Sequence, residues 1–177
     1  MATNERLRLS CHEAGHAIAA IELGGTCNGV ILTNAGGQTI VDGLYSDRAA
    51  FMYASGPAAE VLADRFEPPA VNSFIAPDEL SATITPGDTS VLAMLCSVAD
   101  IEQLPRSAVS DERELALWSI TGREDEPESW AGRVAFAKRV AAEIVSKNTQ
   151  AILKVAGALY ERGKLSREEI KTLLEVQ

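Results

Sequence analysis

The stretch from Asn4 to Leu23 reads NERLRLSCHEAGHAIAAIEL and predicts a long helix. Its apolar residues recur at steps of three and four, which places them on one helix face. The residues expected on this buried face are Leu7, Cys11, Ala14, Ile18 and Ile21. Thr3 or Asn4 suits the N-cap, and the pair Gly24-Gly25 is a typical helix ending. The sequence therefore predicts that the fold begins with an amphipathic helix.

Two histidines in this stretch, His12 and His16, stand four residues apart, so a helix places them on one face. Two neutral imidazoles at this spacing can bind the same zinc ion. Glu13 would project beside the metal, where a carboxylate can take a proton from water and pass it to a leaving amine. These are the chain's 2 histidines, and the pattern H-E-x-x-H arises by chance in a chain of this size at roughly one per cent or less. The simpler alternative is a chance pair of histidines on a helix surface.

Gly15 lies between the two histidines in sequence. Glycine inside a helix costs about 1 kcal/mol relative to alanine. The absence of a side chain would let either another backbone segment or a substrate approach closely. The sequence leaves both explanations for Gly15 open.

A small amount of β-structure is expected next. The runs Gly29–Thr33 and Gln38–Val41 are rich in β-forming residues, and Asn34-Ala35-Gly36-Gly37 between them supplies a turn. A second helix is expected from Asp47 to Arg65, with its pattern interrupted by a Gly-Pro pair. The proline-rich stretch from Phe66 to Pro86 is typical of a long surface loop.

The rest of the chain is expected to be helical. Helices are predicted from about Thr85, over Ser107 to Ile120 and over Glu128 to Arg162, and a last one opens with the capping box Ser166–Glu169. The apolar stripe of the longest helix is Val134, Ala137, Ala141, Ile144, Ile152, Val155 and Leu159. We therefore expect a mainly α (α+β) fold in a single domain, residues 1–177, with a small β-sheet or hairpin near the N-terminus.

Composition excludes some classes of partner. The formal net charge of −9 argues against binding nucleic acid or an anionic membrane surface, because both need basic residues. The 3 cysteines show no metal-binding or disulfide spacing and are expected to be small buried apolar residues. No apolar run approaches the roughly 20 residues of a membrane span, and no apolar leader precedes the first helix. The expected location is cytoplasmic.

Several segments resemble the FtsH-type peptidase family, the protease part of the membrane AAA+ protease FtsH. The segment His12-Glu13-Ala14-Gly15-His16-Ala17 resembles the zinc motif of that family. Ser55-Gly56-Pro57-Ala58-Ala59-Glu60 is similar to its Gly-Gly-Arg-Ala-Ala-Glu segment, with proline in place of the arginine. Thr85-Pro86-Gly87-Asp88 is similar, in shortened form, to its Thr-Gly-Ala-Ser-x-Asp region. The last two helices also follow the closing pattern of the family.

The resemblance implies a set of site residues. His12, His16 and Asp88 would bind zinc, Glu13 would be the general base, and Glu60 would orient a histidine from behind. Residues that could instead complete the zinc site are Glu60, Asp64 and Asp78. The residues themselves leave a further alternative, because an acid after Thr85-Pro86 is also an ordinary helix start.

The resemblance also implies an activity, namely an ATP-independent zinc metalloendopeptidase that cleaves unfolded or flexible polypeptides. The sequence has no Walker A pattern, so this looks like a stand-alone relative of the protease domain. Candidate partners are a polypeptide substrate, a second copy of the chain in a homo-oligomer, and a separate ATPase. The alternative is a non-proteolytic FtsH-like domain that binds polypeptide or a partner protein, with structural zinc.

Overall fold

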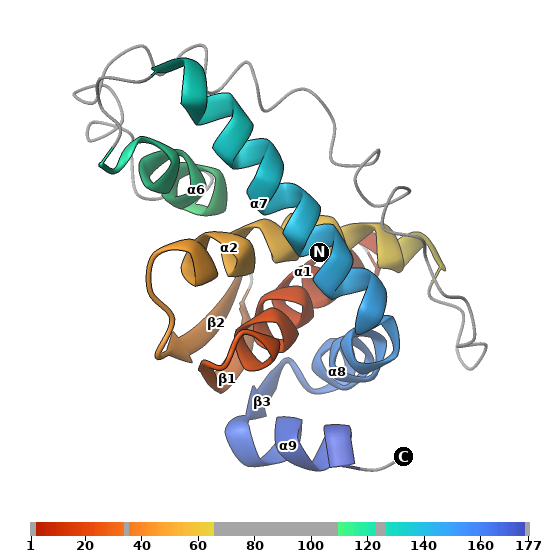
Figure 1. Cartoon of the computed structure of the whole chain (residues 1–177). Helices are drawn as coiled ribbons and strands as arrows, with labels where there is room; N and C mark the ends of the chain where they lie inside the picture. Colours follow the sequence, from red (N-terminus) through yellow and green to blue (C-terminus); the bar gives the residue numbers. More distant parts are fainter. Residues whose placement is uncertain (1–2, 34–35, 66–109, 123–126, 176–177) are drawn as a thin grey trace.

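The computed structural model describes residues 3–33, 36–65, 110–122 and 127–175. These ranges are mainly helical, with a small antiparallel sheet, which confirms the predicted mainly α (α+β) class (Figure 1). The elements in chain order are α1 (Thr3–Glu22), β1 (Thr26–Thr33), β2 (Gly36–Asp42), α2 (Asp47–Ala59), the 3-10 helix η1 (Glu60–Arg65), α6 (Ser110–Ile120), α7 (Pro127–Lys147), α8 (Thr149–Arg162), β3 (Lys164–Ser166) and α9 (Arg167–Glu175).

Helix α1 is the central element of the fold. It packs against α2, α8 and both strands of the hairpin, and from residue 10 to residue 20 only His12 is more than slightly exposed. A helix that is covered on nearly all sides needs small and apolar residues, and alanine predominates here. The prediction for Ile21 was wrong, because this side chain is 40% exposed beyond the packed part of the helix. Gly24, with φ of 82°, then ends the helix, and Gly25 N–H donates to Ala20 O at 2.8 Å.

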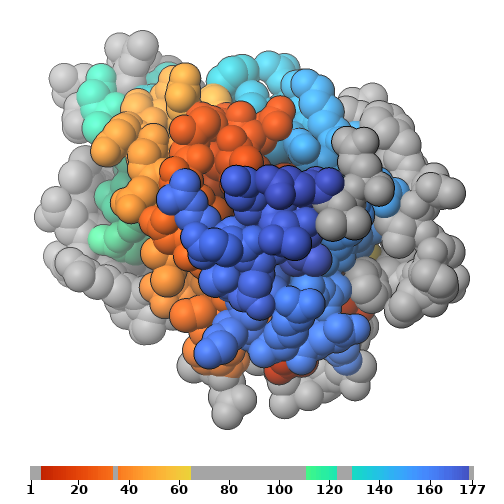
Figure 2. Space-filling view, turned by 90° about the horizontal axis from the view of Figure 1, so that it is seen from below, coloured from red at the N-terminus to blue at the C-terminus, as the bar shows by residue number. Residues whose placement is uncertain are grey.

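The sheet combines a hairpin from the first quarter of the chain with a short strand just before α9. The predicted hairpin is present as β1 and β2, and β3 pairs with the other side of β1, so the strand order is β2-β1-β3. The third strand was not expected from the sequence, because three residues are too few to show an alternating pattern. Val30 lies opposite both Thr39 and Leu165. In Figure 2 the blue C-terminal residues accordingly lie against red and orange N-terminal residues.

The second helix continues through the Gly56-Pro57 pair and changes character only after it. Expected as a single helix from Asp47 to Arg65, this segment is α-helical to Ala59 and then 3-10 helical. Glu60 N–H donates to Pro57 O, three residues earlier, which is the 3-10 spacing. Glu60 is the first residue of η1, which packs on α1.

The expected long helix from Glu128 to Arg162 is wrong in one respect, because it is broken into α7 and α8. At Asn148 the backbone leaves the helical region, with φ of −109° and ψ of 17°. The Asn148 amide donates to Ile144 O at 2.9 Å, and the Thr149 hydroxyl donates to Val145 O at 3.0 Å. Such side chains compete with the backbone for helix carbonyls and favour a break. The predicted apolar stripe is buried on both halves.

The remaining expectations concern the last helix, the stretch after η1 and membrane spans. The capping box is confirmed, since Ser166 N–H donates to Glu169 Oε2 at 2.8 Å and Glu169 N–H to Ser166 Oγ at 3.3 Å. The expected loop from Phe66 to Pro86 and the helix from about Thr85 lie outside the described residues. Within the described part of the chain, no helix combines the length and the apolar character needed to cross a membrane.

Candidate metal site

The site is formed where α1 and α2 lie unusually close together. A Cβ added at Gly15 would lie 2.6 Å from both Ala59 Cβ and Ser55 O of α2. Gly15 is therefore explained by the approach of another backbone segment, one of the two explanations that the sequence left open. The close approach brings the face of α2 directly over the two histidines of α1.

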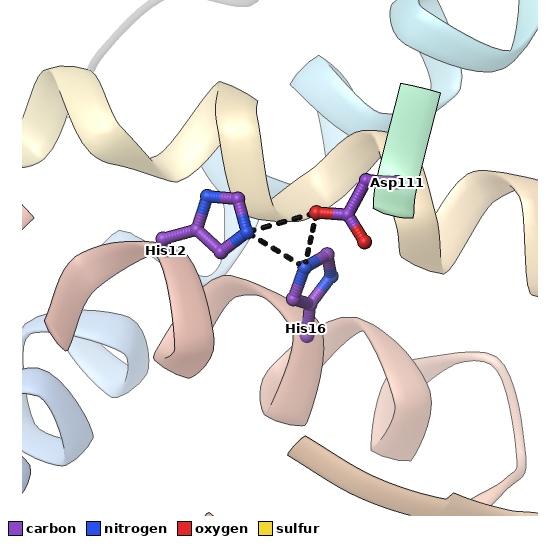
Figure 3. Close-up of side chains that lie close together, drawn as sticks. All are labelled: His12, His16 and Asp111. Atoms are coloured by element: carbon purple, nitrogen blue, oxygen red, sulfur yellow. Dashed lines mark hydrogen bonds and ion pairs between the residues drawn. The ribbon is translucent and has the colours of Figure 1, made fainter. Parts of the chain in front are cut away.

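Three ligand atoms converge at this place (Figure 3). His12 Nε2 and His16 Nε2 lie 3.1 Å apart, and Asp111 Oδ2 lies 2.8 Å from the first and 3.0 Å from the second. The histidines come from neighbouring turns of α1, and Asp111 comes from the first turn of α6. The His16 side chain is 6% exposed, and those of His12 and Asp111 are 18% and 17% exposed. These three residues could hold a metal ion.

The other ring nitrogen of each histidine is held by an acceptor. His12 Nδ1 lies 2.8 Å from Glu60 Oε1, and His16 Nδ1 lies 2.8 Å from Met52 O. A carbonyl can only accept, and Glu60 is an acceptor in its ionised form, so both Nδ1 atoms carry the proton. In the neutral rings the unprotonated Nε2 atoms then face each other and Asp111. This is the arrangement of metal-binding histidines, whose far nitrogen donates to a carboxylate or a backbone carbonyl.

The three converging atoms require a positive charge among them. Two imidazole lone pairs and a carboxylate oxygen at about 3 Å repel one another unless a proton or a metal cation lies between them. For His12, burial opposes a positive charge, but the hydrogen bonds to Asp111 and Glu60 outweigh it and raise the pKa to about 10. For Asp111, burial raises the pKa, but the two histidines lower it well below its usual range. The carboxylates of Asp111 and Glu60, which contact the imidazoles, favour a positive charge at this place.

Two imidazole nitrogens and one carboxylate oxygen are donors that divalent metal ions accept. Zinc takes histidine nitrogen and carboxylate oxygen at about 2.0–2.2 Å in tetrahedral geometry, so its ligand atoms lie about 3.3 Å from one another. The three sides of the observed triangle, 2.8, 3.0 and 3.1 Å, are close to that value. Three protein ligands are also the number found in catalytic zinc sites, which keep a fourth position for water or substrate.

Gly56 of α2 leaves the space that the imidazoles occupy. A Cβ at this position would overlap with the His16 ring and would lie 2.9 Å from His12 Nε2. The residue is buried and lies one turn before Glu60 on the face of α2 that covers α1. The segment around Gly56 therefore contributes to the site in two ways. Gly56 leaves room for the imidazoles, and Met52 O and Glu60 accept hydrogen bonds from them.

Glu13 follows His12 in α1 and is 4% exposed. Its Oε2 accepts a hydrogen bond of 2.6 Å from the Thr39 hydroxyl of β2. Its carboxylate also lies against Gly37, where any Cβ would overlap with it. The charge of Glu13 contributes to raising the pKa of His12, its neighbour in the chain.

The carboxylates considered from the sequence have different positions. Glu60 contacts His12 through Nδ1, the nitrogen turned away from the three converging atoms. Asp64 is exposed and is not part of that group. Asp88 and Asp78 lie outside the described residues, so the structure leaves the role expected for Asp88 untested. Asp111 takes the position between the histidines within the described chain.

The sequence does not single out Asp111. It stands in the first turn of α6, and an acid there is as well explained by the helix dipole as by a metal. Asp88 has the same kind of local setting, so neither spacing nor capping separates the two. Within the described chain, the packing of α6 on α2 and α7 accompanies the approach of Asp111 to the histidines.

Comparison with known proteins leaves the family open. The sequence matches no protein-family model and no curated protein. The FtsH-type resemblance therefore stays a prediction based on the segments quoted above.

Proposed function

We propose that this chain is an ATP-independent zinc metalloendopeptidase that cleaves unfolded or flexible polypeptides. The observation that carries the proposal is the convergence of His12 Nε2, His16 Nε2 and Asp111 Oδ2. The carboxylate of Glu13, the residue after His12, is buried. Two histidines and one carboxylate are a ligand set of hydrolytic zinc sites. Zinc held there would supply Lewis-acid chemistry, because it acidifies water and polarises a scissile carbonyl.

The protein groups have separate tasks in this proposal. His12, His16 and Asp111 hold the metal, while Glu60 and Met52 O fix the orientation of the two imidazoles. Glu13 takes a proton from the attacking water and passes it to the leaving amine. Burial of Glu13 and His16 keeps bulk water from competing for these hydrogen bonds.

The position of β2 supports a polypeptide as the substrate. In the described sheet β2 is an edge strand, and its Thr39 contacts the Glu13 side chain. An extended peptide can add to such an edge through backbone hydrogen bonds, which read no particular sequence. This mode of binding requires a segment that is locally unfolded, so the expected substrates are flexible polypeptides.

The direct test measures bound zinc and cleavage of an unstructured protein such as casein, without ATP. Removing zinc with a chelator should abolish cleavage, and adding zinc should restore it. Glu13→Gln should retain stoichiometric zinc and lower kcat by at least roughly 100-fold, the range expected for a general base. Glu22→Gln, an exposed glutamate at the end of the same helix, is the matched control and should cleave normally. Stoichiometric zinc without hydrolysis in the wild type would favour a non-proteolytic domain with structural zinc.

The third ligand has its own test. Asp111→Asn should lose stoichiometric zinc, whereas Asp88→Asn should keep it. Glu112→Gln, next to Asp111 in sequence, is the control for a local disturbance of α6. If Asp88→Asn loses zinc and Asp111→Asn does not, the ligand implied by the family resemblance is the correct one.

A further inference from the structure

Strand β2 presents two neighbouring residues of one face to α1. Side chains alternate along a strand, so Gly37 and Thr39 point the same way. Thr39 lies opposite Val30, which is fully buried against the helices, whereas Gln38 lies opposite Ile31 and both are exposed. Gly37 and Thr39 therefore lie on the sheet face that covers α1.

Both residues contact the carboxylate of Glu13. The Thr39 hydroxyl has one proton and lies 2.6 Å from Glu13 Oε2 but 3.1 Å from the main-chain oxygen of the same residue. A distance of about 2.6 Å is typical of a hydroxyl that donates to an ionised carboxylate, so the proton is directed to Oε2. Gly37 lies directly against the same side chain, and a Cβ at this position would overlap with Oε1, Cδ and Cγ of Glu13.

A glutamate side chain has three rotatable bonds and does not hold one orientation unaided. Helix α1 fixes only the backbone of Glu13, and burial to 4% exposure leaves no water shell to hold the carboxylate. The two contacts from β2 restrict its position from the side opposite to the helix. Within the described sheet, the edge strand is thus also the strand that contacts Glu13.

We propose that Thr39 is a positioning residue that holds Glu13 in the orientation for catalysis, with Gly37 leaving the space for it. This inference rests on the proposed function. It assigns β2 two roles, since the same strand would align the substrate and the base. A general base must lie within hydrogen-bond distance of the proton that it takes, so a displacement of about 1 Å is expected to lower the rate roughly 100-fold.

The test compares Thr39→Val with Thr39→Ser in the zinc-loaded full chain acting on casein. Valine has nearly the shape of threonine but no hydroxyl, and serine keeps the hydroxyl. We expect Thr39→Val to lower kcat roughly 100-fold with KM within about twofold of wild type and stoichiometric zinc, and Thr39→Ser to restore most of the rate. A purely structural role predicts the reverse order, because valine is the better strand former. Thr33→Val, which removes a hydroxyl that donates to Gly36 O in the same hairpin, should leave kcat unchanged.

Two further variants separate the possible failures. Adding Thr39→Val to Glu13→Gln should have no further effect on kcat, because the base that Thr39 holds is already absent. Gly37→Ala should lower kcat as Thr39→Val does. Normal kcat in Thr39→Val, alongside a strong loss in Glu13→Gln, would overturn the role of Thr39 and leave the proposed function intact. A wild type that binds zinc and cleaves nothing would overturn both.

Discussion

The two long sides of α1 are built from different kinds of group. Toward α8 the contact is largely apolar, with Val155, Ala156 and Leu159 fully buried, and Arg6 adds a hydrogen bond to Tyr160 O. Toward α2 the contact includes glycines, backbone oxygens and imidazoles beside apolar side chains. At Gly15 and Gly56 an added side chain would overlap with atoms of the opposite helix. One helix therefore forms both the apolar core and the candidate metal site.

This difference predicts opposite responses to a change in side-chain volume. On the α8 side atoms can be removed, at a cost in stability, without moving the ligands. On the α2 side atoms cannot be added, because the imidazoles already occupy the space. Variants on the α8 side should alter the free energy of unfolding, and variants on the α2 side should alter zinc affinity.

The largest effect is expected for Gly56→Ala. The new Cβ would overlap with the His16 ring and lie 2.9 Å from His12 Nε2, so both ligands would have to move. We expect zinc affinity to fall by more than roughly 100-fold, the upper end of what losing an outer partner costs. Competition with a chromogenic chelator measures this change.

The matched control is Gly132→Ala. Gly132 is also a helix residue, but nothing lies within 4 Å of an added Cβ. This variant should bind zinc normally and be slightly more stable, since alanine is the better helix former by about 1 kcal/mol. Unchanged zinc affinity in Gly56→Ala would show that α2 can shift away from α1 without moving the imidazoles. The expected sensitivity of the α2 side to added atoms would then be wrong.

The next largest effect is expected for Leu159→Ala, on the other side of α1. Removing a fully buried leucine side chain leaves a cavity, and such changes destabilise proteins by about 2–5 kcal/mol. Urea unfolding of the metal-free protein measures the change, while zinc affinity of the folded protein should match wild type. Leu173→Ala, at a partly buried position of α9, should destabilise the protein less. A large loss of zinc affinity in Leu159→Ala would mean that the two sides are coupled.

The same contrast explains how much of the fold the sequence predicts. The apolar stripe of α7 and α8 repeats at helical steps, and all its residues are buried as expected. The break at Asn148 was missed, because the stripe stays in phase across it and only local side-chain hydrogen bonds reveal it. Strand β3 was missed because its three residues become a strand only by pairing with β1.

The candidate site is predictable only where its residues are neighbours in sequence. His12, Glu13 and His16 stand together in the chain, so their spacing alone shows that they share a helix face. Asp111 is 95 residues from His16 and reaches it through the packing of two other helices. The contact of Thr39 with Glu13 likewise depends on how the hairpin lies on α1. Contacts between residues so far apart in sequence leave no periodic pattern from which they could be predicted.

A smaller effect is expected for Glu60→Gln, which keeps the shape of the side chain but removes its charge. Glu60 Oε1 lies 2.8 Å from His12 Nδ1, so it holds the tautomer that binds metal through Nε2. Replacing such a partner typically lowers metal affinity about 10–100-fold. Chelator competition measures the loss, with Glu143→Gln, an exposed acid of α7, as the control. An unchanged affinity would mean that Glu60 is not needed to orient His12.

The smallest effect is expected for Arg8→Gln, which extends the comparison to the outermost contact of the site. Arg8 Nη2 lies 2.9 Å from Glu60 Oε2, but the Arg8 side chain is 57% exposed. Exposed ion pairs contribute about 0.2–1 kcal/mol, which is at most about a fivefold change in affinity. The loss of zinc affinity should shrink further in 1 M salt, where charges are screened beyond about 3 Å. Arg162→Gln removes a similar exposed pair with Glu169, far from the site in sequence, and should leave zinc affinity unchanged. If Arg8→Gln weakens zinc binding as much as Glu60→Gln does, Arg8 rather than burial keeps Glu60 in place.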